Sequence, residues 1–314
     1  MIMDALRLLR SGRVEEGLAR YREALAGDAQ RLLVGVHAGM LDSIGRFEAA
    51  SAIREAGLNR GCDLGLRTAL PGSTPEQIAT EYEALFERGL VNSWMVSRYL
   101  LALERSGRRM ELRELLDPAQ RVRQLRIELP ASGSSNGTLS SAVREAVLAR
   151  ESEATFEAKS QSVRMMHNLP HLQDIPDPAF RCLAATIRSE VERLIEEWVP
   201  GPHPVARWCP SRFSLSMWAL TSRGEGFNAR HVHHVGWYTG IYYATGVDGA
   251  GGELRIGRPE EVAADSPAWP DLRICPEPGL LVLMPSYFTH WTERLGRPGL
   301  RISVPFDVLE ERPT

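Results

Sequence analysis

The spacing of hydrophobic residues changes along the chain, near residue 206. Before that point apolar residues recur every three or four positions, in segments rich in Ala, Leu, Arg and Glu, which predicts amphipathic helices. After it, short runs are either alternating or wholly apolar and are separated by glycine turns, which predicts strands. The strands are expected at 212–221, 228–243, 253–256, 271–275, 280–284 and 300–306. Because strands and helices do not alternate, the pattern favours an antiparallel barrel or jelly roll.

The helices fall on both sides of a turn-rich segment. They are expected at 75–89, 92–107, 139–158 and 176–198. Ser73 or Thr74 would cap the first of these helices, and residues 159–176 are expected to form a loop. The segment 130–137, PASGSSNG, has the composition of a linker. We therefore expect an α+β chain of two domains: a helical domain, a connecting region and a β domain with supporting helices, at 1–130, 131–175 and 176–314.

A faint internal repeat occurs in the helical part. The segment 12–25, GRVEEGLARYREAL, recurs thirty-three residues later at 45–58, GRFEAASAIREAGL, and a weaker copy begins at Gly107. This period, with a glycine opening the second helix, resembles tetratricopeptide repeats, and an irregular helical bundle is the alternative. Stacked helix pairs leave a concave face, which would bind a peptide or protein, serve as a homodimer surface or cap the β domain.

Composition excludes several classes of protein. The chain has 314 residues, enough for two cores, and its 43% hydrophobic and 25% charged residues are ordinary for a globular protein. A net charge of −3 gives no reason to expect nucleic-acid or membrane-surface binding. The four cysteines show no C-x-x-C spacing, and no run is long enough to span a membrane. We expect a cytoplasmic protein with reduced thiols.

Three of the eight histidines lie within four residues, at the entrance to the predicted strand 228–243. On a strand, residues i and i+2 face the same side, so His231 and His233 would point one way and His234 the other. Two such imidazoles can hold a first-row metal ion when a third ligand arrives from elsewhere. An exposed histidine cluster is the alternative interpretation.

A second group of polar residues follows about sixty residues later. The buried strand 280–284 leads through a proline break to His290, and strand 300–306 then places Arg301 and Ser303 on one face. The planar fork of arginine matches a carboxylate in two-point contact, so this face could bind an organic acid.

The order of these motifs resembles that of a known family. His231-x-His233, then WYTGIYY at 237–243, then His290, then Arg301-x-Ser303 is similar to the 2-oxoglutarate/Fe(II) oxygenases. The likeness is to bacterial and phage members with an H-x-H-P segment before a W-x-S-G-x-Y-Y strand, and it covers about residues 205–308. Here His234 replaces the proline and Thr239 replaces the serine.

The resemblance implies a double-stranded β-helix (jelly roll) with Fe(II), 2-oxoglutarate and dioxygen as cofactors. It implies His231, His233 and His290 as metal ligands and Arg301 as the anchor of the cosubstrate. Further candidates for cosubstrate binding are Ser303, Tyr243, Tyr242 and Asn228. Most of the wider superfamily has a carboxylate where this chain has His233. Glu253 is therefore the alternative to His233 as the third metal ligand; in that case His233 would lie next to the ligands without binding the metal itself.

Two other classes of function remain open from sequence. Three histidines with an open position also describe a hydrolytic zinc centre, although a hydrolase has no need of an Arg301-Ser303 anchor. The other class is a non-catalytic binding module. Within the oxygenase class, the helical domain suggests hydroxylation, or another oxidation, of a peptide or protein; a free amino acid or other small molecule is the alternative.

Overall fold

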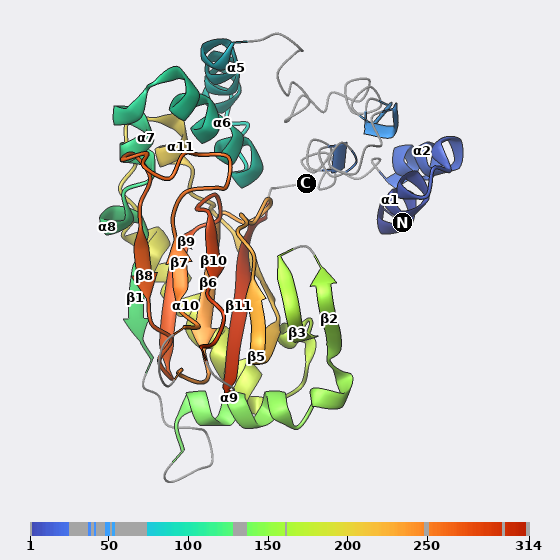
Figure 1. Ribbon diagram of the computed structural model, residues 1–314, viewed down its shortest axis with the longest axis vertical. Helices are drawn as coiled ribbons and strands as arrows, with labels where there is room; N and C mark the ends of the chain where they lie inside the picture. Colours follow the sequence, from blue (N-terminus) through green and yellow to red (C-terminus); the bar gives the residue numbers. More distant parts are fainter. Residues whose placement is uncertain are drawn as a thin grey trace.

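The computed structural model describes residues 2–24, 37–38, 41, 48–50, 52–53, 74–127, 137–160, 162–247, 251–296 and 299–311 (Figure 1). The helices are α1 (Ile2–Arg10), α2 (Val14–Ala24), α5 (Pro75–Glu87), α6 (Ser93–Ser106), α7 (Arg109–Leu115), α8 (Pro118–Arg121), α9 (Leu139–Leu148), α10 (Pro178–Glu196) and α11 (Pro204–Arg207), with short 3-10 turns at Glu151–Glu153 and Leu172–Asp174. The strands are β1 (Arg123–Arg126), β2 (Thr155–Ser160), β3 (Val163–Leu169), β4 (Phe213–Met217), β5 (Ala219–Asn228), β6 (Tyr238–Tyr243), β7 (Leu254–Ile256), β8 (Leu272–Ile274), β9 (Leu280–Pro285), β10 (His290–Thr292) and β11 (Leu300–Glu310). No helix in the described part of the chain is long and apolar enough to cross a membrane.

The first two helices pack against each other. α1 and α2 bury Leu9 and Tyr21 in a small hydrophobic core. The first copy of the predicted repeat supplies α2, whereas the second copy, 45–58, lies mostly outside the described residues. The tetratricopeptide-like repeat therefore stays a prediction.

Helices α5 and α6 follow the predicted 75–89 and 92–107 closely. Thr74 caps α5 in a capping box with Gln77, and the Asn92 side chain accepts a hydrogen bond from Met95 N at the start of α6. Gly107 ends α6 with φ 76°, a left-handed conformation that glycine adopts without a steric penalty. Local sequence signals thus determine both helices.

The strands form two antiparallel sheets. The large one has eight strands in the order β1-β9-β6-β11-β5-β3-β2, with β4 also paired to β11, and the small one has the order β10-β7-β8. Buried side chains of both sheets share one core, for example Ile241 and Val282 with Leu254 and Ile256. The other face of the large sheet packs on α9 and α10. These findings confirm the predicted antiparallel β architecture with supporting helices.

The predicted loop 159–176 is wrong. It contains most of the β2–β3 hairpin, which extends the large sheet through the pairing of β3 with β5. A β-bulge between Arg164 and Met166 interrupts the strand, and Met165 there has φ 53°. The extra residue interrupts the alternation of buried and exposed side chains along β3, so the sequence pattern does not predict a strand here.

Three further boundaries differ from the prediction. Helix α9 ends at Leu148 instead of 158, and residues 222–226, which lie between the predicted strands 212–221 and 228–243, belong to β5. β1 precedes the predicted linker yet pairs with β9, so the segment before residue 130 contributes a strand to the large sheet. A division of the chain at residue 130 would therefore separate the edge strand β1 from the rest of this sheet, and the predicted domain boundaries stay a prediction.

Gly240 allows β6 and β11 to pack closely. A Cβ atom at Gly240 would lie 2.1 Å from Cζ of Phe306, its cross-strand neighbour. We expect Gly240→Ala to lower the free energy of unfolding by about 1–3 kcal/mol, because overpacking forces the ring and the strands apart. Urea denaturation measures this. Gly246→Ala, whose nearest contact would be 3.1 Å, should cost less, and equal effects would contradict the packing account.

Candidate metal centre

The His-x-His segment is an irregular connection between β5 and β6, and the continuous strand predicted for 228–243 is wrong. His231 forms an isolated bridge with His290, in which each backbone N donates to the other backbone O at 3.0 Å. His233 N donates to Ser286 O at 2.9 Å. These pairs hold the segment against the chain that precedes and begins β10. Local sequence patterns do not predict this contact, because the paired residues are more than fifty positions apart. The regular strand starts only at Tyr238.

Helix α6 also holds this segment. Ser93 Oγ donates to Gly236 O at 2.6 Å, and Trp94 N donates to His234 O at 3.2 Å. The first turn of a helix has free N–H groups, and one of them is satisfied here by the chain that carries the histidines. The helical segment 74–121 is thus part of the support of the site.

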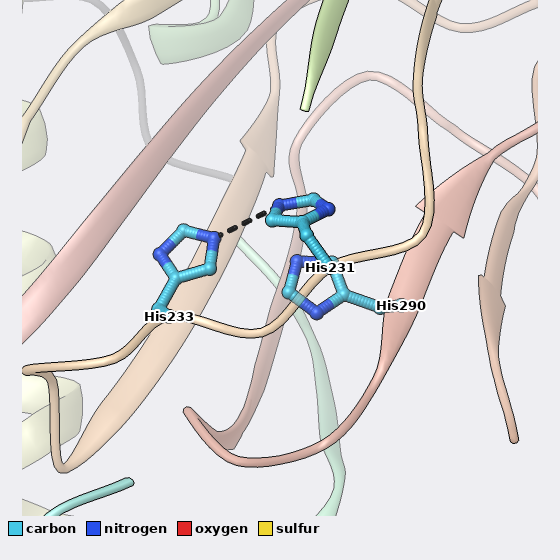
Figure 2. A group of neighbouring side chains, drawn as sticks. All are labelled: His231, His233 and His290. Atoms are coloured by element: carbon cyan, nitrogen blue, oxygen red, sulfur yellow. Dashed lines mark hydrogen bonds between the residues drawn. The ribbon is translucent and has the colours of Figure 1, made fainter. Parts of the chain in front are cut away.

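The structure brings the three predicted histidines together (Figure 2). Their potential ligand nitrogens all lie within 4.8 Å of one another. The ring centroids of His231 and His290 are 4.3 Å apart, and His233 lies 5.1 Å and 5.2 Å from these two rings. Glu253 is not part of this cluster; its carboxylate pairs with Arg273. The rival third ligand is therefore not brought to the site.

The outer nitrogen of each ring has a hydrogen-bond acceptor. His231 Nδ1 donates to Ala229 O at 2.8 Å, and His290 Nδ1 donates to Phe288 O at 2.9 Å. A carbonyl can only accept, so the proton of each neutral ring is on Nδ1 and Nε2 keeps its lone pair. His233 Nδ1 lies 2.6 Å from Asp307 Oδ1, which fixes the same tautomer. Three Nε2 atoms are thereby left free for a metal ion.

Burial keeps two of these rings neutral. It lowers the pKa of His290 to about 3, with a smaller contribution from His233, and it lowers the pKa of His231 well below its usual range, with contributions from His290 and His233. A metal ligand must be the deprotonated imidazole. At neutral pH the two rings are already in the state that binds a metal.

A cavity of about 1180 Å3 opens onto the three histidines. Three of the predicted cosubstrate residues also line it, namely Asn228, Tyr243 and Ser303. Ser303 on β11 lies directly opposite Tyr243 on β6. The Tyr243 hydroxyl is buried and has no hydrogen-bond partner among the described residues, and burial raises its pKa, so it stays a donor. Tyr242 points to the opposite face, into the core with α10, and its predicted contact with the cosubstrate is not supported.

Arg301 lies just behind the cavity wall and is 2% exposed. Its Nη2 lies 3.2 Å from Oγ1 of Thr292, which lines the cavity, and its Nη1 lies 3.0 Å from Gly252 O. Within the described residues no carboxylate is paired with Arg301, so its charge is balanced only by neutral oxygens and a sulfur atom. A buried, uncompensated guanidinium next to an unpartnered hydroxyl fits the carboxylate of an organic acid.

Sequence reasoning missed Asp307 and the cavity wall formed by α6. Asp307 continues the alternation of Arg301, Ser303 and Pro305 along β11, so the two-residue period could have placed it on the site face. The face of α6 that lines the cavity contains Trp94, Ser97, Arg98 and Leu101. No local signal identifies these residues, because their contacts with the site span more than a hundred positions.

The comparisons with known proteins agree with the site. The family model described as "Putative 2OG-Fe(II) oxygenase" matches residues 216–307, which contain all three histidines and Arg301. This match confirms the predicted class of enzyme, a 2-oxoglutarate-dependent Fe(II) oxygenase, and the predicted metal and cosubstrate. The chain has no match among the curated proteins.

Several solved structures are similar. A prolyl-4-hydroxylase of Pseudomonas putida has 16% identity and a TM-score of 0.45, over 64% of this chain and 100% of that one. SnoK, a non-heme alpha-ketoglutarate-dependent carbocyclase from nogalamycin biosynthesis, has 16% identity and a TM-score of 0.45, over 63% and 83% of the two chains. HygX from Streptomyces hygroscopicus, with nickel and 2-oxoglutarate bound, has 14% identity and a TM-score of 0.40, over 64% and 88%.

Proposed function

We propose that the chain hydroxylates, or otherwise oxidises, an unactivated C–H bond of a peptide or peptide-like substrate. The observation that carries this proposal is the cavity, which combines the three histidines with a wall from the helical segment. Its volume of about 1180 Å3 exceeds that of most small-molecule pockets, which hold roughly 300–1,000 Å3. It therefore has room for both 2-oxoglutarate and a substrate of several residues.

We assign the metal to Nε2 of His231, His233 and His290. Three ligands from one side would leave an Fe(II) ion open to reactants that enter through the cavity. A bound Fe(II) ion would couple two events. One oxygen atom of dioxygen would be used to convert 2-oxoglutarate into succinate and carbon dioxide, and the other would be inserted into the substrate. The protein residues bind and orient the reactants and keep bulk water away from them.

We assign the far carboxylate of 2-oxoglutarate to the Arg301 side of the cavity. Arg301 supplies the charge, and the Tyr243 and Ser303 hydroxyls supply hydrogen-bond donors on the adjacent strands. The lack of any carboxylate partner for Arg301 in the described residues supports this assignment. Asn228, at the end of β5, lines the same cavity and completes the proposed binding residues.

The experiment that tests the proposed function measures 2-oxoglutarate consumption by the purified full chain. We expect succinate to form slowly without substrate, and only when Fe(II) and dioxygen are both present. Incubation with a peptide library should then give products heavier by one oxygen atom. If Zn(II) replaces Fe(II), succinate formation should stop. Zn(II)-dependent hydrolysis without any succinate formation would contradict the proposal and favour a hydrolytic enzyme.

The wall formed by α6 gives a test of substrate recognition. Arg98 is exposed, lines the cavity and makes no ion pair or hydrogen bond with the described residues. If it contacts the substrate, Arg98→Ala should raise KM for the identified substrate about tenfold, since a charge-assisted hydrogen bond is worth roughly 1.5–3 kcal/mol. Substrate-free succinate formation should not change. Arg105→Ala, on the same helix but outside the cavity, is the control, and equal KM values for both variants would remove Arg98 from recognition.

A further inference from the structure

Asp307 lies against the outer nitrogen of His233. Its Oδ1 is 2.6 Å from His233 Nδ1, and the two side chains are 15% and 11% exposed. On β11 it is paired with Thr239 of β6 on one side and Ser216 of β4 on the other. Backbone pairing on both sides fixes the position of the carboxylate, so the contact does not depend on a flexible loop.

The neighbours of His233 also determine which of its two ring nitrogens carries the proton. Thr239 Oγ1 donates to Phe306 O at 2.9 Å, so toward His233 Nδ1, at 3.2 Å, it can only accept. Asp307 and Thr239 both accept from Nδ1, and Nε2 therefore faces His231 at 3.2 Å. The Trp218 ring stacks on the imidazole at 5.9 Å and 20°. The tautomer and the plane of the ring are both determined.

His233 differs from the other two histidines in the charge of its partner. His231 and His290 donate to neutral backbone carbonyls, whereas His233 donates to a carboxylate. Asp307 is also the only acidic residue that contacts any of the three rings within the described chain. Three imidazoles bring no negative charge to an Fe(II) ion, and in a buried site an anion one ring away interacts strongly with the metal.

We propose that Asp307 is a positioning residue that supplies, through His233, the negative charge that the three-histidine ligand set lacks. The inference rests on the proposed function, because it requires Fe(II) at the three histidines. The charge makes His233 Nε2 a stronger donor and stabilises the bound dication. The same charge repels the dianion 2-oxoglutarate, so Asp307 strengthens metal binding and weakens cosubstrate binding.

Asp307→Asn separates charge from geometry. The asparagine Oδ1 can still accept from His233 Nδ1, and the side chain has nearly the same size, but the charge is lost. We expect Fe(II) affinity, measured by anaerobic calorimetry on the full chain, to fall about 10- to 100-fold. At saturating Fe(II), 2-oxoglutarate affinity should rise about threefold or more, because one repulsion is removed. A purely structural defect would weaken both affinities together.

Two further variants complete the experiment. Asp307→Glu keeps the charge and should hold Fe(II) affinity closer to wild type than Asp307→Asn does. Asp265→Asn makes the same chemical change at an exposed position outside the cavity and should leave both affinities unchanged. An unchanged Fe(II) affinity in Asp307→Asn, or a parallel fall of both affinities, overturns the inference. A wild-type chain that binds no Fe(II) overturns the proposed function itself.

Discussion

Replacing any one of His231, His233 and His290 by alanine is expected to lower Fe(II) affinity by about 100-fold or more. A structural zinc site of four ligands provides roughly 10–16 kcal/mol, or about 3 kcal/mol per ligand, and 1.4 kcal/mol is a factor of ten. The expectation applies to His233 as much as to the other two, because its potential ligand nitrogen lies within the same 4.8 Å cluster. Anaerobic titration with Fe(II) measures the effect, and succinate formation should be lost in parallel.

The decisive comparison is between His233→Ala and Glu253→Gln. Glu253 is the carboxylate that would replace His233 if the site were of the two-histidine, one-carboxylate type. In the structure its carboxylate pairs with Arg273 and does not approach the three rings. We expect Glu253→Gln to bind Fe(II) like the wild type. Loss of Fe(II) binding in Glu253→Gln, with His233→Ala unaffected, would contradict the three-histidine assignment.

Arg301→Ala is expected to weaken 2-oxoglutarate binding about thirty-fold or more while changing Fe(II) affinity much less. Removing one partner of a desolvated charge pair costs roughly 2–5 kcal/mol. The variant also leaves Gly252 O without its side-chain donor, whereas Thr292 Oγ1 still accepts from Asn228 N, so some loss of stability is expected. Arg301→Lys, which keeps the charge but not the planar fork, should lose less affinity than Arg301→Ala. Unchanged cosubstrate affinity in Arg301→Ala would refute the anchor.

A pair of tyrosine variants tests the same pocket without disturbing Arg301. The Tyr243 hydroxyl has no partner among the described residues, so Tyr243→Phe should unfold at nearly the wild-type temperature. If this hydroxyl donates to 2-oxoglutarate, the variant should bind it about tenfold or more weakly. Tyr242→Phe, on the opposite face of the same strand, should leave cosubstrate affinity unchanged. Equal affinities in both variants would remove Tyr243 from the site.

Sequence patterns predicted the parts of the fold that short-range signals control. The Thr74 and Asn92 caps act within four residues, and the apolar stripe of α10 repeats every three to four positions. The bulge at Met165 instead shifts the alternation of β3 by one residue, and β1 depends on its pairing with β9. Such features depend on long-range backbone pairing, which no local pattern records.

The candidate site also has some residues that the sequence predicts and others that only the folded chain brings to it. The three histidines and Arg301 were found because their order and spacing resemble a family motif, even though the His-x-His segment is not a strand. Asp307 lies on the face of β11 that Ser303 identifies, but its partner His233 is distant in sequence. The contribution of α6 depends on hydrogen bonds from Ser93 and Trp94 to a segment about 140 residues away, and only the folded chain reveals them.

We expect an Fe(II) ion to occupy the site formed by the three imidazoles, and 2-oxoglutarate to complete it. Such a ligand set leaves most of the charge of the ion uncompensated until a dianion arrives, so the two ligands should bind with positive coupling. The direct measurement is anaerobic titration of the full chain with Fe(II), in the presence and in the absence of 2-oxoglutarate. We predict saturation at one ion per chain, and tighter binding when 2-oxoglutarate is present. Fe(II) binding that does not saturate, or an affinity that 2-oxoglutarate leaves unchanged, would contradict the account.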